Sequence, residues 1–208
     1  MSKIKLTKGE LKRQRDSLSQ FRHFLPTLQL KKQQLQLRIS ETRKELEACL
    51  HDMQGLDDKI KKWQGLVMDP QIEEGIIEKA IRPEKIDTEL INVAGAKVPF
   101  LKEIIFSELE YDLFLMPFWL DEGLEKLKQK AEVIIKIKVI KERLAILSEE
   151  LRITTQRVNL FEKIKIPECL DNIRRIRIYL GDQQANAVGI SKVAKKKVDQ
   201  RYSEEALV

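Results

Sequence analysis

The chain has 208 residues, of which 35% are charged and 6% aromatic, with eight glycines and six prolines. Few aromatics and few helix breakers disfavour a compact enzyme and indicate long helices with solvated faces, while the apolar fraction of 42% excludes a disordered chain. The net charge of +6 is unevenly placed: residues 1–15 and 192–201 are basic, whereas residues 103–125 carry seven acids and no Lys or Arg.

The first third of the chain has the spacing of a coiled coil. Seam positions recur at alternating intervals of three and four residues from Leu11 to Val67, interrupted only by Gln14, Lys32 and Thr42. A mean spacing of 3.5 residues predicts a supercoiled helix that needs a partner helix. Pro26 lies inside this helix, where we expect it to cause a kink or to remove one backbone hydrogen bond.

The last third repeats this pattern in two stretches. One seam runs from Val133 to Phe161, and a second runs from Ile166 to Ala194. The step between them is five residues, and Pro167 sits at the break. We interpret the step as a phase adjustment with a kink inside one helix, not as a domain boundary.

Two long helices in one chain are predicted to pair with each other in antiparallel fashion. The expected fold is therefore mainly α, a long antiparallel two-helix coiled coil with a small middle segment containing a short β-hairpin. Its parts are an N-terminal helix (1–68), a middle segment (69–122) and a C-terminal helix (123–208). The basic ends would then meet in one positive tip made of Lys3, Lys5, Lys8, Lys192, Lys195, Lys196 and Lys197.

The middle segment is punctuated by proline and glycine. Residues 89–93 and 98–106 read as two short strands around Ala94-Gly95-Ala96, with Pro99 compatible only with an edge strand. A short helix is expected around residues 71–81. An aromatic cluster before the second long helix either closes the turn as a small core or serves as a docking surface. The cluster comprises Phe114, Met116, Phe118 and Trp119.

The sequence has few candidate residues for catalysis, metal binding or cofactor binding. No phosphate-binding Gly-rich loop ending in Gly-Lys-Ser/Thr occurs, and His23 and His51 have no second His or Cys at metal-ligand spacing. Cys49 and Cys169 fall on seam positions and are expected to be packed thiols. We therefore predict no catalytic residue, no cofactor and no metal. The N-terminus does not resemble a signal peptide and no apolar run approaches membrane-spanning length, so a soluble intracellular protein is expected.

The basic ends allow three interpretations. They are a solvated face, a contact for an acidic protein socket, or a surface for nucleic acid or an anionic membrane. No aromatic residues are interleaved with Lys195-Lys196-Lys197 and Tyr202 stands alone, which disfavours nucleic acid.

Several motifs, in order, resemble a known family. Arg157-Val158-Asn159-Leu160-Phe161-Glu162 followed by Ile166-Pro167 is similar to the "RRVNALE…IP" segment of the D subunit of the V-type (vacuolar/archaeal-type) rotary ATPase. The N-terminal stretch 6–11 (LTKGEL), the stretch 28–35 (LQLKKQQL) and Lys97-Val98-Pro99 also resemble segments of that family. The resemblance covers nearly the whole chain.

The resemblance implies a non-catalytic rotor axle. The paired helix ends would enter a hexamer of alternating A and B subunits, which hold the nucleotide sites. The middle region would join the F subunit of the stalk and, through a funnel-shaped subunit, the membrane ring that carries the ions. The chain would then lie on the cytoplasmic face of the membrane. Alternatives are a coiled-coil adaptor or scaffold without a rotary partner and a nucleic-acid-binding coiled coil; an enzyme is disfavoured.

Overall fold

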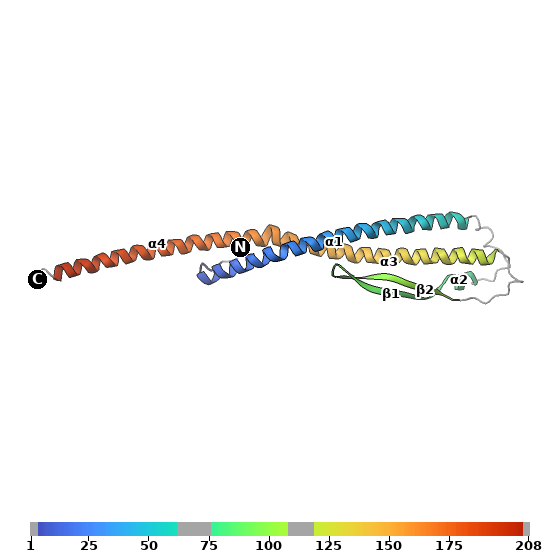
Figure 1. The fold of residues 1–208 in the computed structure, drawn as a ribbon, viewed down its shortest axis with the longest axis horizontal. Coiled ribbons are helices and arrows are strands. Elements are labelled where there is room, and N and C mark those ends of the chain that lie inside the picture. The colour runs from blue at the N-terminus through green and yellow to red at the C-terminus, as the bar shows by residue number, and fades with distance from the viewer. Residues whose placement is uncertain (1–3, 62–75, 108–118, 206–208) are drawn as a thin grey trace. The chain divides into compact units, whose positions relative to one another are not determined.

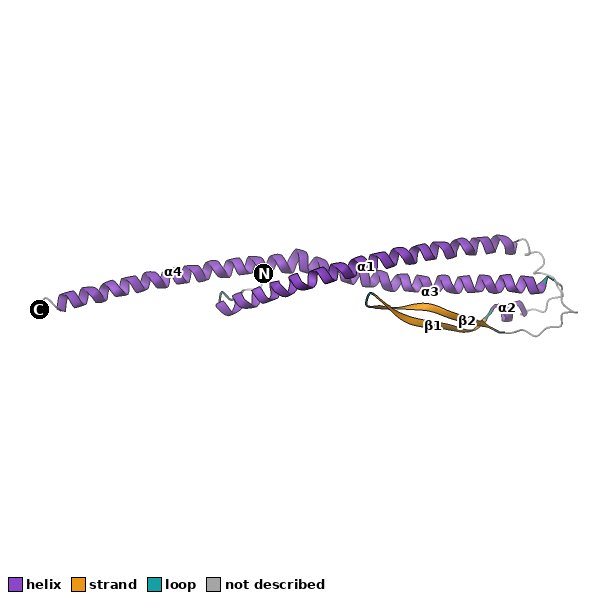
Figure 2. Cartoon of the chain, in the orientation of Figure 1, coloured by secondary structure: helices purple, strands orange, loops and turns teal. Residues whose placement is uncertain are grey.

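The computed structural model describes residues 4–61, 76–107 and 119–205, and these are mostly helical (Figures 1 and 2). The elements follow the order helix, short helix, hairpin and a long interrupted helix. Their bounds are α1 (Lys8–Lys61), α2 (Ile76–Ile81), β1 (Pro83–Val93), β2 (Ala96–Phe106), α3 (Leu120–Asn159), the π-helix η1 (Leu160–Lys165) and α4 (Ile166–Glu205). The expected mainly α fold with a central β-hairpin is confirmed.

The chain forms two compact units. Unit 1 contains residues 1–30 and 155–208, and unit 2 contains residues 31–154. Unit 1 combines the two ends of the chain, whereas unit 2 is one continuous range. The expected division into residues 1–68, 69–122 and 123–208 stays a prediction.

In unit 2 the helices α1 and α3 run antiparallel. Three ion pairs join the two helices, and along these pairs the residue number in α1 rises while the residue number in α3 falls. The pairs are Lys31–Glu150 at 2.6 Å, Glu45–Arg143 at 2.8 Å and Asp57–Lys130 at 2.6 Å. This order confirms the antiparallel pairing expected from the two seams.

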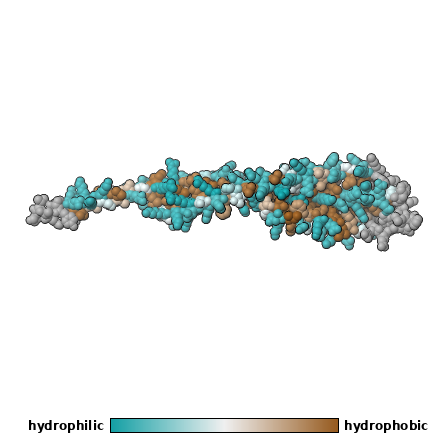
Figure 3. Space-filling view, viewed as in Figure 1, coloured by the Kyte–Doolittle hydropathy of each residue, from teal (hydrophilic) through white to brown (hydrophobic). Residues whose placement is uncertain are grey.

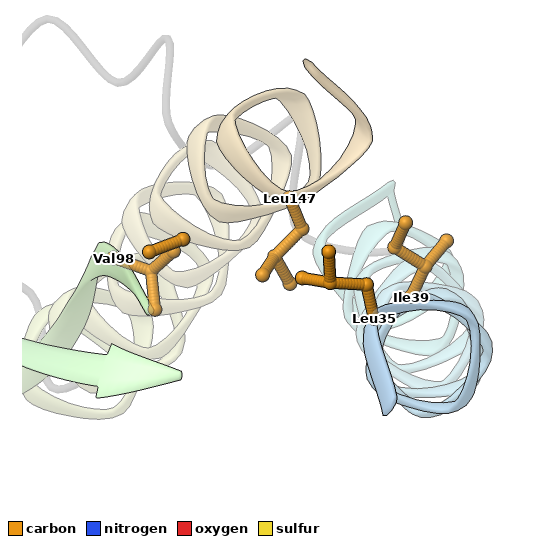
Figure 4. Close-up of a cluster of buried hydrophobic side chains, with 5 residues drawn as sticks. Leu35, Ile39, Val98 and Leu147 are labelled. Carbon is orange, nitrogen blue, oxygen red and sulfur yellow. The ribbon is translucent and has the colours of Figure 1, made fainter. Parts of the chain in front are cut away.

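The core of unit 2 lies between these helices and the hairpin. Leu35 and Ile39 of α1 pack with Leu147 of α3 and with Ala96 and Val98 of β2 (Figure 4). Leu35, Val98 and Leu147 are almost completely buried. Leu35, Ile39 and Leu147 all belong to the predicted seams, whereas the hairpin contribution extends the seam into a three-element core.

The hairpin has a tight two-residue turn. Ala94 and Gly95 both have positive φ, at 51° and 85°, as a type I′ turn requires. The backbone N–H of Gly95 donates to the side-chain Oδ1 of Asn92 at 3.0 Å, which stabilises the turn. Val93 pairs with Ala96 and Leu90 with Pro99 in an antiparallel two-stranded sheet. The predicted hairpin is confirmed, although β1 begins at Pro83 instead of residue 89.

In unit 1 the start of α1 pairs with η1 and α4. The rings of Phe21 and Phe161 lie 5.0 Å apart, and Gln14 approaches Asn172. The helix α1 begins after Thr7, whose hydroxyl accepts a hydrogen bond from the N–H of Glu10 at 3.3 Å. It continues without interruption through Pro26, which removes one backbone donor but does not end the helix.

The predicted phase adjustment is a π-helix. The residues of η1 span the junction between the two C-terminal seams, and the N–H of Ile166 donates to the carbonyl of Phe161, five residues earlier. A π-turn accommodates one residue more than an α-turn, so the following seam regains its orientation. The step of five residues from Phe161 to Ile166 is one longer than the usual seam step of four, and the π-turn accommodates this additional residue.

Candidate functional site

The two basic ends do not meet in unit 1, contrary to the expectation from the sequence. Lys5 shares a hollow with Lys165, Glu168 and Asn172 of the η1–α4 segment. From Asn172 to Lys192 the helix continues for 20 residues, or roughly 30 Å. In Figure 1 the start of α1 accordingly lies part-way along α4.

The physical reason is a difference in length. The helix α1 has 54 residues, whereas α3 and α4 have 40 residues each and are joined by the six residues of η1. All residues from 181 to 200 are exposed. Lys192, Lys195, Lys196 and Lys197 therefore lie on an exposed stretch of α4, and Lys5 and Lys8 are exposed at the other end of the pairing. Lys3 lies outside the described residues.

The family-motif residues lie around the start of the π-helix and of α4. Val158 is buried in unit 1, where it belongs to the predicted seam, whereas Arg157, Asn159 and Pro167 are not buried. Pro167 is the second residue of α4, directly after the π-helix. The motif thus coincides with the change of helix type that restores the seam.

The aromatic residues of the middle segment are only partly described. Trp119 is buried and packs beside Gly123, where an added Cβ would lie 3.2 Å from the indole ring. Phe114 and Phe118 lie outside the described residues. The docking surface expected at Phe114, Phe118 and Trp119 stays a prediction, and burial of Trp119 agrees with the core alternative.

Arg143 connects three elements of unit 2, which the sequence did not suggest. Its Nε donates to the carbonyl of Pro99 in β2 at 3.2 Å, and its Nη1 pairs with Glu45 of α1 at 2.8 Å. Its guanidinium carbon lies 3.7 Å from the centroid of the Phe100 ring. Because the Arg143 side chain is only 7% exposed, these contacts attach the hairpin firmly to the helix pair.

Both cysteines are packed thiols, as their seam positions suggested. Cys169 is buried, and desolvation raises its pKa, with a smaller contribution from Glu168. Cys49 is partly buried, and desolvation followed by Glu45 raises its pKa. A raised pKa lowers the thiolate fraction, so neither environment activates a nucleophile.

One surface feature of unit 1 escaped the sequence analysis. A groove of about 670 Å³ runs between α1 and α4, and four arginines line it. We call it the arginine groove; its residues are Arg15, Leu18, Ser19, Arg22, Leu170, Ile173, Arg174, Arg177 and Ile178. Arg15 and Arg22 are seven residues apart, and this spacing predicts that they lie on the same face of the helix, beside the seam.

Comparison with known proteins identifies the family. The model of the family described as the D subunit of ATP synthase matches residues 10–196. The chain belongs to the family of ATP synthase D subunits. A relative from Borreliella burgdorferi, named as the D subunit of a V-type ATP synthase, is 41% identical, covering 94% of this chain and 95% of the relative.

Two further relatives in this family carry the same name. One from Chlamydia pneumoniae is 35% identical over 95% of this chain and 94% of its own length. One from Chlamydia trachomatis serovar L2 is 35% identical over 96% of this chain and 98% of its own length. The similarity thus includes both long helical regions and the hairpin.

Within the described parts of this member of the D-subunit family, no group of three or more His, Cys, Asp or Glu side chains could hold a metal ion. None of the described helices has the length and apolarity needed to cross a membrane.

Proposed function

We propose that this chain is the non-catalytic central-stalk component, or rotor shaft, of a V-type ATP synthase/ATPase. It couples nucleotide turnover in the A/B hexamer to rotation of the membrane ring and hence to proton or sodium transport. The observation that carries the proposal is the family match across residues 10–196. The match spans most of α1 and α4 and the whole of the hairpin and α3, so the proposal does not depend on a single motif.

The helix pairs suit transmission of torque. Two supercoiled helices whose side chains interdigitate resist twisting more than a single helix does. In unit 2 the buried seam of Leu35, Ile39 and Leu147 is reinforced by ion pairs at 2.6–2.8 Å. Arg143 adds the hairpin as a third element, so unit 2 responds as one packed body.

The partners follow from the proposed role. The basic, exposed stretch of α4 with Lys192, Lys195, Lys196 and Lys197 faces the A/B hexamer, and Lys5 and Lys8 contribute further along the pair. The middle region joins the F subunit of the stalk and, through the funnel-shaped subunit, the membrane ring. The chain then lies at the cytoplasmic face of the membrane, as a peripheral part of the complex.

Reconstitution tests this proposal. The purified A/B hexamer is mixed with the full chain and the F subunit, and both co-purification and ATP hydrolysis are measured with and without the chain. Stable co-purification and a chain-dependent change in sustained hydrolysis are expected. A chain that fails to bind the hexamer would contradict the rotor role and favour a scaffold protein.

A further inference from the structure

The arginine groove of unit 1 is unusual in its charge. Arg15 and Arg22 come from α1, and Arg174 and Arg177 come from α4. No carboxylate lines the groove, and none of these four side chains forms an ion pair within the described residues. All four arginines are exposed, so their charges are accessible to a partner.

The opposite side of the same helix pair provides an internal comparison. There Glu10 pairs with Arg13, and Lys165 pairs with Glu168 at 3.2 Å. Arg175, one residue from Arg174, pairs with Asp171 at 2.8 Å. Charges on that side are balanced locally, so the unbalanced arginines are a property of the groove and not of unit 1 as a whole.

The groove is also apolar between its charges. Leu170 and Ile178 are 44% and 57% exposed, and Leu18 is partly exposed beside them. Exposed branched apolar side chains under a basic rim match a partner that presents carboxylates and an apolar side chain together. A phosphate-rich ligand would use the cations but would leave the apolar floor without a contact.

The choice of arginine over lysine also favours a partner with carboxylates. All four are arginines, whose planar guanidinium groups bind carboxylates through two parallel hydrogen bonds. On each helix the lining residues recur at intervals of three and four, so each helix contributes one face to the groove. A helical or hairpin segment with Asp or Glu flanking a Leu-like residue would fit between the two rows.

We propose that the arginine groove binds an acidic, partly apolar segment of a subunit of the A/B hexamer. The four arginines bind carboxylates of that segment, and Leu170 and Ile178 pack against its apolar side chain. This inference rests on the proposed function for the identity of the complex. It adds a contact surface distinct from the lysine-rich stretch at residues 192–197.

Paired charge variants test the groove. Arg174→Gln/Arg177→Gln removes two groove cations, and the matched control Arg13→Gln/Arg175→Gln removes two cations that already have partners on the other side. Both variants change the net charge equally, and equal circular dichroism and thermal unfolding of the two would establish that both are folded. The measured quantity is the Kd of the full chain for the purified A/B hexamer with the F subunit present.

The groove variant is expected to weaken binding on the order of tenfold, while the control changes it less than about threefold. Equal effects of the two variants, or no effect of either, overturn the groove inference while leaving the rotor proposal intact. A wild-type chain that does not bind the hexamer overturns both. Inorganic polyphosphate that binds the chain through these arginines, with hexamer affinity unchanged in the variant, assigns the groove to phosphate and also overturns the inference.

A photo-crosslinker identifies the bound segment. Benzoylphenylalanine replaces Ser19 in the groove, and in the control it replaces Ser17, which lines the opposite hollow. The Ser19 crosslink is expected on a partner peptide containing Asp or Glu next to a large apolar residue, and the Ser17 crosslink on a different peptide or none. A Ser19 crosslink to a segment without carboxylates would contradict the proposal.

Discussion

Arg143 and Phe100 form a cation–π contact, with the guanidinium carbon 3.7 Å from the ring centroid. The contact joins α3 to β2, and the same arginine also reaches the Pro99 carbonyl and Glu45 of α1. A nearly buried cation with three partners links the hairpin to both helices of unit 2. The hairpin is thereby part of the packed body and not a loose appendage.

Replacing Arg143 should loosen the hairpin. We expect Arg143→Met to lower the free energy of unfolding by ~2 kcal/mol, because a carbonyl and an aromatic face lose their cation while Glu45, half exposed, regains water. Urea unfolding measures the change, and hydrogen exchange in β2 reports its location. Arg152→Met, which breaks only the exposed Arg152–Glu149 pair, should leave both readouts unaltered. Equal behaviour of the two variants would refute the role of Arg143.

The core between the helices and hairpin gives a second prediction. Leu147→Ala should cost ~2–5 kcal/mol of unfolding free energy, because Leu147 is nearly inaccessible and contacts α1 and the hairpin core (Figure 4). Leu37→Ala, at an exposed position of α1, should cost far less. Chemical denaturation compares them, and a similar loss for both would show that the seam is not the core of unit 2.

The π-helix predicts that one residue of η1 can be deleted with little effect on stability. Removing Glu162, an exposed residue of η1, should convert the π-turn into an α-turn while keeping both flanking seams directed at α1. Helicity and the unfolding midpoint should therefore change little. Removing Lys141, exposed in the regular helix α3, should rotate the adjoining seams by about 100° relative to each other and cost ~2 kcal/mol or more. If deletion of Glu162 is as damaging as deletion of Lys141, the phase account is incorrect.

The thiols supply a pH-dependent prediction. In a Cys49→Ser chain, Cys169 should react slowly with Ellman's reagent near pH 8, because burial blocks access and raises its pKa. The rate should increase as pH rises towards that pKa, since the thiolate fraction grows, and urea should accelerate it further. A folded chain that reacts at the rate of a free cysteine would contradict the buried position.

The sequence predicted the main architecture because seams and turns are local signals. The 3–4 spacing located both helices, and Ala94-Gly95 located the hairpin turn, where both residues have positive φ. The five-residue step from Phe161 to Ile166 marked the phase change, although spacing alone does not distinguish a π-turn from a kink.

Contacts between distant segments were harder to predict. Arg143 reads as a surface residue between two seam positions, and only the folded hairpin gives it partners in Pro99 and Phe100. The meeting of the basic ends was wrong because seam spacing fixes which face pairs but not where along the partner the pairing starts. The pairing of Phe21 with Phe161 sets that offset in unit 1 and leaves residues 181–200 of α4 exposed.

The hairpin carries an exposed hydrophobic surface (Figure 3). The seam spacing of the helices does not predict this surface. Ile86, Leu90 and Ile91 of β1 and Ile105 of β2 are exposed. Strand alternation predicts one buried face, but two register shifts, which leave Glu84 of β1 and Lys102 of β2 as extra residues, change which residues share a face. Which side chains remain exposed therefore had to come from the structure.

Rotation of this chain inside its complex is the most direct measurement of the central claim. A bead is attached through a cysteine introduced at the exposed residue Lys59 in a chain with Cys49→Ser and Cys169→Ala, and the reconstituted A/B hexamer is fixed to a surface. The rotor account predicts that ATP drives continuous rotation of the bead in one direction. A bead that stays still, or that moves without direction while the same complexes hydrolyse ATP, would contradict it.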